Sequence, residues 1–184
     1  VFENFALVAG DEVWYYTEND FYVTNETSLR LAKGQQNSTD PYLNYWEGQR
    51  GAFNMFVALR DCNIFLENLK EVPSLTTGEK NRWIAEVKTL KAFYHFWLMR
   101  MYGPIPIIDE NIPVDASPEE TQIERKSVDE VVNYIVGLLD EAINSEALVE
   151  NITFVHTEYG RLTLPAATTI KTQVLMLVAS SLFN

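Results

Sequence analysis

Residues 78–104 read GEKNRWIAEVKTLKAFYHFWLMRMYGP, and this stretch decides the fold. Its large apolar side chains recur every three or four positions, as the buried face of an α-helix requires. The pair Gly103-Pro104 stops the period, because glycine accepts the left-handed conformation that ends a helix and proline cannot continue one. The pattern predicts a helix over 79–102. Its second half, AFYHFWLM at 92–99, is apolar almost all round and should be buried on several sides.

Three further helices are predicted around this one. Apolar residues at helical spacing indicate helices over 52–70, 127–145 and 165–182. Pro73 ends the first of them, and Pro165 suits the first turn of the last. The helix at 127 opens with Ser127-Val-Asp-Glu130, a capping box in which the serine hydroxyl accepts from the glutamate amide and the glutamate carboxylate accepts from the serine amide.

Long helices joined by short connections predict an all-α fold. We expect antiparallel helical hairpins in a tetratricopeptide-like, right-handed array, although the repeat interpretation rests on helix spacing alone. Residues 1–50 lack a sustained helical period and are predicted to be irregular and rich in loops, whereas residues 51–184 form the helical repeats. The polar run KGQQNSTD at 33–40 has almost nothing apolar to bury and reads as an exposed loop.

Composition limits the class of function. The chain has 184 residues, enough for one domain or part of a larger one, and 26 acidic against 14 basic side chains give a formal net charge of −12. Such a charge repels a phosphate backbone, so we expect no nucleic acid partner. The single cysteine excludes an intrachain disulfide framework, and no apolar run reaches the ~18 residues of a membrane span. The chain opens with Val1 and has no basic n-region, so we expect that a targeting segment was removed or precedes it.

Five blocks of the helical region occur in the order found in one known family. They are Asn63–Asn68 (NIFLEN); Glu86, Lys88, Leu90, Ala92, Phe93 and Tyr94; Arg100, Tyr102, Gly103, Pro106 and Ile107; Arg125, Ser127, Val128 and Glu130; and Gly160, Arg161, Thr163, Ala166, Ala167 and Lys171. With these blocks the chain resembles the SusD/RagB family of glycan-binding lipoproteins of the Bacteroidetes outer membrane. The resemblance covers about residues 50–184 well and the first 48 poorly. One departure is Lys91, where the family usually has arginine.

The resemblance implies a function that the blocks themselves do not carry. Family members are several-fold longer, so the chain looks like their N-terminal helical part, without the lipidated start and the C-terminal region. The resemblance implies non-catalytic binding of oligosaccharide or polysaccharide at the surface of the outer membrane. It also implies delivery to a TonB-dependent, SusC-like transporter, with membrane contact only through a lipid anchor outside this chain. A helical protein-interaction scaffold without glycan affinity is the alternative.

No catalytic motif or metal-ligand pattern is present, so we expect no enzyme, no metal and no cofactor. His95 lies in the most apolar helical stretch and is interpreted as a core histidine, and Cys62 on an apolar stripe as inert packing. A hydrolase would have to use carboxylate pairs such as Asp11-Glu12. Two adjacent carboxylates on one short segment do not provide the opposed geometry that glycoside cleavage needs.

One loop combines the groups that suit a sugar. Aromatic rings pack on the apolar face of a pyranose, and planar polar groups bind paired hydroxyls; loops on a rigid scaffold often hold such sites. The alternative is that the aromatic rings only pack the loop onto the first helix, and the two interpretations stand about even. The candidate glycan-binding residues are Asp40, Tyr42, Asn44, Tyr45, Trp46 and Arg50.

Overall fold

A computed structural model describes residues 30–69, 71–153, 155–181 and 183. The chain divides into two compact units, residues 1–55 and residues 56–184. The sequence pattern placed the change from irregular to helical structure between residues 50 and 51, close to this boundary. In the first unit, residues 30–32 are helical and a loop follows them. The carboxylate pair Asp11-Glu12 lies outside the described residues.

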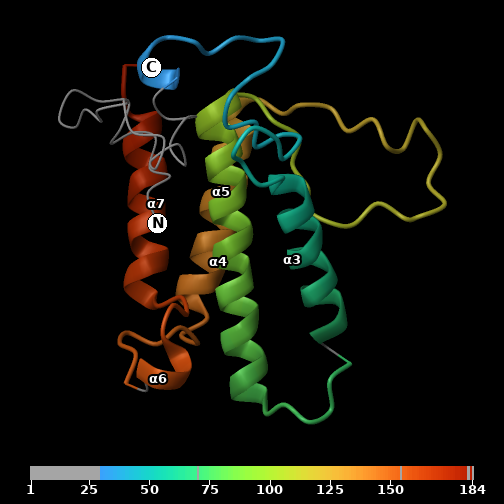
Figure 1. The fold of residues 1–184 in the computed structure, drawn as a ribbon. Coiled ribbons are helices and arrows are strands. Elements are labelled where there is room, and N and C mark those ends of the chain that lie inside the picture. The colour runs from blue at the N-terminus through green and yellow to red at the C-terminus, as the bar shows by residue number, and fades with distance from the viewer. Residues whose placement is uncertain (1–29, 70, 154, 182, 184) are drawn as a thin grey trace. The chain divides into compact units, whose positions relative to one another are not determined.

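The second unit contains two long antiparallel helices followed by three more (Figure 1). Helix α3 spans Met55–Leu69 and helix α4 spans Thr77–Tyr102. Thr76 begins α4 with a capping box that also involves Glu79, a signal the sequence interpretation did not use. Gly103 ends α4 with a φ of 72°, and its amide donates to the carbonyl of Met99. This positive φ is why a glycine stands at the position that stops the helical period.

The three remaining helices follow a long connection. Helix α5 spans Val128–Asn144, α6 is the single turn Val155–Glu158, and α7 spans Leu164–Val178. The predicted capping box is present at the start of α5, and the N-cap of α7 is Thr163, whose side chain accepts from the amide of Ala166.

The predicted all-α array of helical hairpins is confirmed, with small differences at its edges. Pairing between extended segments within the described residues is limited to two isolated bridges, Asn44 with Gln49 and Ile105 with Lys126. The last helix ends at Val178 and not at residue 182. Just after this end, the hydroxyl of Ser180 donates to the carbonyl of Leu177. The short α6 was not predicted, because one turn is too short to display a helical period.

The core lies where α4 packs against α5 and where α5 packs against α7. Ala92, His95, Phe96, Leu98 and Met99 of α4 are buried, so the expected burial of the apolar half of this helix is confirmed. The apolar residues with no exposed surface are Leu59, Ala92, Leu98, Met99, Ile105, Val131, Ile135, Leu139, Ala142, Ala167 and Val174.

Two arginines and two glutamates tie α4 to the segment before α7. We call Arg82, Glu86, Glu158 and Arg161 the arginine–glutamate cluster. The Arg82 guanidinium donates to Glu86 at 3.0 Å and to Glu158 at 2.6 Å, and Arg161 donates to Glu86 at 2.9 Å. Every side chain of the cluster is less than a third exposed. Because the Arg82–Glu158 and Arg161–Glu86 ion pairs join residues about 75 positions apart, they fix where the chain returns to α4.

Replacing Ser127 with alanine should lower the free energy of unfolding by about 1 kcal/mol, because the hydroxyl accepts from the amide of Glu130 at the start of α5. Urea denaturation measures the change. Ser127→Asp is the control, since aspartate is an equally good N-cap and should cost much less. An unchanged midpoint in the alanine variant would mean that the α5 cap contributes nothing to stability.

Candidate functional site

The candidate loop is ordered by hydrogen bonds between its own residues. The side chain of Gln36 pairs with the backbone of Tyr42 in both directions, at 2.7 and 3.0 Å. Leu43 and Asn44 then donate their amides to the carbonyls of Arg50 and Gln49. These bonds hold residues 36–50 in a defined shape, so the side chains on the loop have fixed positions relative to one another.

Asn44 and Gly48 form the tight turn of this loop. Asn44 is only 7% exposed, and its amide group donates to the carboxylate of Glu47 and accepts from the Glu47 backbone amide. Gly48 has a φ of 74°, and a Cβ there would lie 2.8 Å from Asn54. The turn therefore requires glycine, and the Asn44 side chain is used to order it.

Asp40, Tyr42 and Arg50 lie together on the loop, and we call them the loop cluster. Arg50 donates two hydrogen bonds to the Asp40 carboxylate, and both side chains are about half exposed. Its guanidinium carbon lies 5.9 Å from the centre of the Tyr42 ring, and Arg30 donates to the Tyr42 hydroxyl at 2.7 Å. The hydrogen bond from Arg50 holds the pKa of the Asp40 carboxyl below its usual value. The cluster thus presents an aromatic ring between charged, planar hydrogen-bonding groups.

Tyr45 and Trp46 lie between Tyr42 and Arg50 in the sequence, and both are half-buried. The carbonyl of Tyr45 accepts from the amide of Met55 at 3.0 Å, so its backbone joins the loop to the residue that begins α3. Both residues also make further hydrogen-bonding, ring or electrostatic interactions with other parts of the protein. Half-burial is consistent with packing and with a sugar platform alike, so the two interpretations of these rings stay open.

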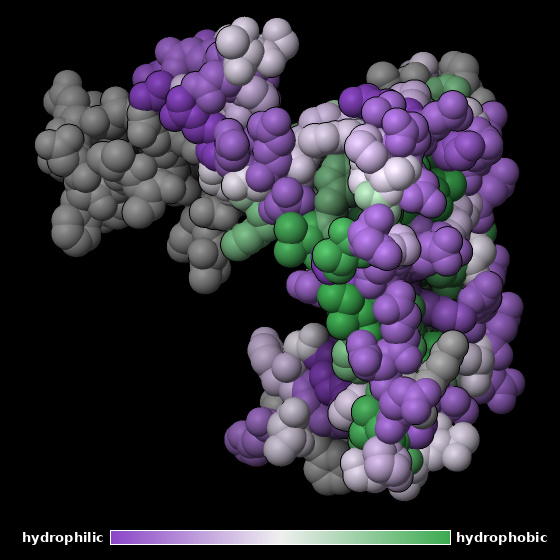
Figure 2. All heavy atoms as spheres, turned by 90° about the vertical axis from the view of Figure 1, so that its right-hand side faces the viewer, coloured by the Kyte–Doolittle hydropathy of each residue, from purple (hydrophilic) through white to green (hydrophobic). Residues whose placement is uncertain are grey.

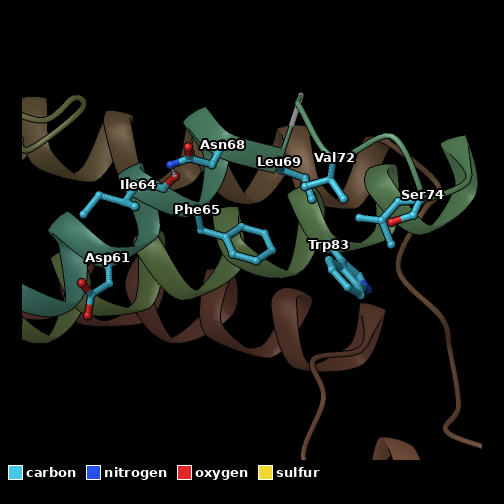
Figure 3. Close-up of a pocket in the computed structure, with 9 residues that line it drawn as sticks. Asp61, Ile64, Phe65, Asn68, Leu69, Val72, Ser74 and Trp83 are labelled. Atoms are coloured by element: carbon cyan, nitrogen blue, oxygen red, sulfur yellow. Dashed lines mark hydrogen bonds between the residues drawn. The ribbon is translucent and has the colours of Figure 1, made fainter.

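A second candidate region is an apolar pocket of about 620 Å³ in the helical unit, which we call the Trp83 pocket. Figure 3 shows Phe65 of α3 and Trp83 of α4 facing the same space, and their ring centres are 6.1 Å apart. Among the polar residues at its edge, Asn68 donates its amide to the carbonyl of Ile64. Figure 2 faces the α3 side and shows hydrophobic residues among hydrophilic ones; Val57 and Ile64 are 54% and 38% exposed.

A third region is a pocket of about 400 Å³ with both charged and apolar lining residues, between α3, α4 and α5, which we call the inter-helix pocket. Lys91 is 3% exposed, and its ammonium group donates to the Asp109 carbonyl at 2.6 Å and to the Asp109 carboxylate at 3.0 Å. The hydroxyl of Tyr134 donates to the same carboxylate oxygen at 2.7 Å. That bond, together with Lys91, holds the pKa of Asp109 below its usual value, although partial burial opposes the shift. Sequence reasoning missed this site, although Lys91 inside an apolar helix was a signal.

Both ring nitrogens of His95 are hydrogen-bonded next to this pocket. Nδ1 lies 2.8 Å from the carbonyl of Lys91, and Nε2 accepts from the amide of Ile108 at 3.1 Å. The neutral ring therefore carries its proton on Nδ1. Burial lowers the pKa of His95 to about 4. The interpretation of His95 as a satisfied core residue is confirmed.

The remaining sequence expectations concern metal ions, thiol chemistry and the membrane. Burial raises the pKa of the Cys62 thiol to about 11, so the thiol stays protonated at neutral pH, as expected for inert packing. Within residues 30–69, 71–153, 155–181 and 183 no group of three or more His, Cys, Asp or Glu side chains is placed to hold a metal ion. None of the helices that the structure describes combines the length and apolar character needed to cross a membrane.

The chain matches a known protein family over most of its length. The model of the SusD-like family, described as starch-binding and associating with the outer membrane, matches residues 7–168. This match includes most of the segment before residue 50, where the motif resemblance is poor. The comparison with curated proteins gave no match.

Solved structures share the fold. BT4246 is 32% identical with a TM-score of 0.72, over 86% of this chain and 25% of its own. A SusD-like protein from Bacteroides fragilis is 28% identical with a TM-score of 0.60, over 71% and 23%. Surface glycan-binding protein A from Bacteroides thetaiotaomicron, in complex with laminarihexaose, is 22% identical with a TM-score of 0.56, over 66% and 23%, and is similar in fold alone. The chain thus spans about a quarter of the length of these proteins.

Proposed function

The chain belongs to the SusD-like family, and from this membership we propose that it forms the N-terminal helical part of a non-catalytic protein that binds oligosaccharide or polysaccharide at the cell surface. The bound glycan is delivered to a TonB-dependent, SusC-like transporter of the outer membrane. Contact with the membrane is made through a lipid anchor outside this chain. The laminarihexaose complex of a neighbour with the same fold supports an oligosaccharide as the class of ligand.

The loop cluster is the observation that carries the proposal. Asp40 and Arg50 are held together by two hydrogen bonds, and about half of each side chain remains exposed to a ligand. A carboxylate accepts from sugar hydroxyls and a guanidinium donates to them, while the rings of Tyr45 and Trp46 on the same loop can pack on C–H surface. Because the loop is fixed by its own hydrogen bonds, little conformational entropy is lost when a ligand binds.

The alternative is a protein-interaction scaffold without glycan affinity. The exposed apolar residues Val57 and Ile64 lie one above the other on α3, as they would on a helix that receives a partner. The two functions differ in one measurement, because a scaffold binds none of a panel of oligosaccharides.

Trp46→Ala or Tyr45→Ala should weaken glycan binding by about 1 to 3 kcal/mol if these rings are the sugar platform, as for a well-buried binding aromatic. Calorimetry with plant, host and microbial oligosaccharides measures the affinity, and product analysis runs alongside. Tyr159→Ala is the matched control, because Tyr159 is 86% exposed and far from the loop in sequence.

Three outcomes distinguish the alternatives. Loss of affinity in the loop variants but not in Tyr159→Ala supports the platform. Unchanged affinity in both loop variants, with the fold intact, places the site elsewhere and leaves residues 40–50 as loop packing. Release of sugar products would revive the hydrolase interpretation.

A further inference from the structure

One of the residues that line the inter-helix pocket is an exposed glycine, Gly137. Gly137 lies in the interior of α5, where glycine costs about 1 kcal/mol of helix stability relative to alanine. A Cβ at Gly137 would meet no atom within 4 Å, so no close packing requires glycine there. Its φ is also not positive, unlike that of Gly103. What the glycine provides is open space beside Lys91 and Tyr134.

The walls of the pocket combine apolar surface with hydrogen-bonding groups. Leu66 of α3 and Leu138 of α5 line it, together with two ion pairs. One pair joins Lys91 to Asp109, and the other joins Lys88 to Glu141 at 2.5 Å. Asp109 and Glu141 are 72% and 61% exposed, so their carboxylates remain accessible from solvent.

These groups leave hydrogen-bonding capacity free. Among the described residues, the Lys91 ammonium donates only to Asp109. One of its three N–H groups donates to the Asp109 carbonyl and a second to the Asp109 carboxylate. The second oxygen of the Asp109 carboxylate and the lone pairs of the Tyr134 hydroxyl can still accept. A ligand that fits must therefore donate and accept at neighbouring atoms, which vicinal hydroxyls do.

The charge of the lining indicates a neutral ligand. Two lysines and two carboxylates sum to zero, and each lysine is already paired with a carboxylate. A ligand carboxylate or phosphate would compete with Asp109 and Glu141 for the same ammonium groups. A cavity of about 400 Å³ lies within the range of about 300–1,000 Å³ that is typical of small-molecule sites.

We propose that the inter-helix pocket binds one neutral sugar unit of an oligosaccharide, with its hydroxyls on Lys91, Asp109 and Tyr134 and its C–H surface between Leu66 and Leu138. This inference rests on the proposed function and adds a second place of contact, in the helical unit, to the loop cluster. The open space at Gly137, which we call the Gly137 notch, admits the sugar ring.

The test follows the methyl NMR signals of Leu66 and Leu138 while neutral hexasaccharides are added. The probes are laminarihexaose, maltohexaose and xylohexaose, with hexagalacturonate as the acidic counterpart. Leu59, which has no exposed surface and does not line the pocket, is the internal reference. We expect a neutral hexasaccharide to shift the two pocket leucines saturably and Leu59 not at all, and hexagalacturonate to leave all three unchanged.

Gly137→Leu should weaken this saturable shift at least tenfold, because the new side chain enters the notch. Asn133→Leu introduces the same side chain at an exposed position of α5 outside the pocket and should leave binding unchanged. Lys88→Met is a second variant at the pocket mouth and should weaken binding without emptying the core, because Lys88 is 29% exposed.

The outcomes separate this inference from the proposed function. Calorimetric binding that Trp46→Ala weakens, with no shift at Leu66 and Leu138, overturns the pocket proposal and leaves the proposed function standing. Absence of binding in both the calorimetric and the NMR measurements contradicts the pocket proposal and the proposed function alike. A shift with hexagalacturonate alone overturns the assignment of a neutral sugar, and equal loss in Asn133→Leu shows that the effect does not come from the notch.

Discussion

Glu86→Gln should lower the free energy of unfolding by about 3–4 kcal/mol, because it removes the carboxylate on which two arginines converge. Arg82 and Arg161 both donate to Glu86, which is only 13% exposed. Without this charge, Glu158 alone would have to neutralise two guanidinium groups that are mostly removed from water. Urea denaturation followed by circular dichroism measures the loss.

The control for Glu86 is Asp140→Asn. Among the residues that the structure describes, Asp140 pairs only with Lys171, and it is 42% exposed, so this change should cost less than about 1 kcal/mol. Equal losses in the two variants would show that the arginine–glutamate cluster is no more important than an ordinary surface ion pair.

Acidification should destabilise the fold through His95. Burial lowers the pKa of His95 from 6.5 to about 4, so between these values the unfolded chain binds a proton that the native chain does not. The free energy of unfolding therefore falls as the pH drops from about 6.5 and has lost about 3 kcal/mol at about pH 4. In the native state a proton on Nε2 would oppose the amide proton of Ile108. Urea denaturation at a series of pH values gives the slope.

The variant that isolates this effect is His95→Gln, which should be less stable at neutral pH but lose the slope between about pH 6.5 and 5, above the range in which ordinary carboxyl groups titrate. His156→Gln removes the other imidazole, which is exposed on α6. If both variants retained the slope, the acid sensitivity would belong to other groups.

The helices were predictable because their evidence is local. The period of the apolar residues located α3, α4, α5 and the start of α7, and the serine–glutamate pair at 127–130 located the start of α5. The end of α7 was placed too late, because the apolar residues Leu182 and Phe183 continue the composition of a helix while Ser180 binds the backbone of Leu177.

The candidate sites were predictable only in part. The residue types on the loop suggested a ligand, but the pairing of Asp40 with Arg50 depends on a turn that brings together positions ten residues apart. The inter-helix pocket depends on the hydrogen bonds of Asp109 with Lys91 and with Tyr134, which lie 18 and 25 positions away in the sequence. No local sequence pattern encodes such contacts. The sequence did contain one sign of it, a lysine at position 91 among apolar neighbours.

The bridge between Ile105 and Lys126 has a consequence for changes in chain length. The amide of Lys126 donates to the carbonyl of Ile105, and Lys91 and His95 hold the chain again at Asp109 and Ile108. Residues 110–125 therefore form a loop whose two ends are both fixed to the same part of the helical unit. Closing a loop twice as long costs only about 0.6 kcal/mol more, so a peptide tag inserted near Val114, which is 96% exposed, would leave the helices, the loop cluster and the inter-helix pocket in place.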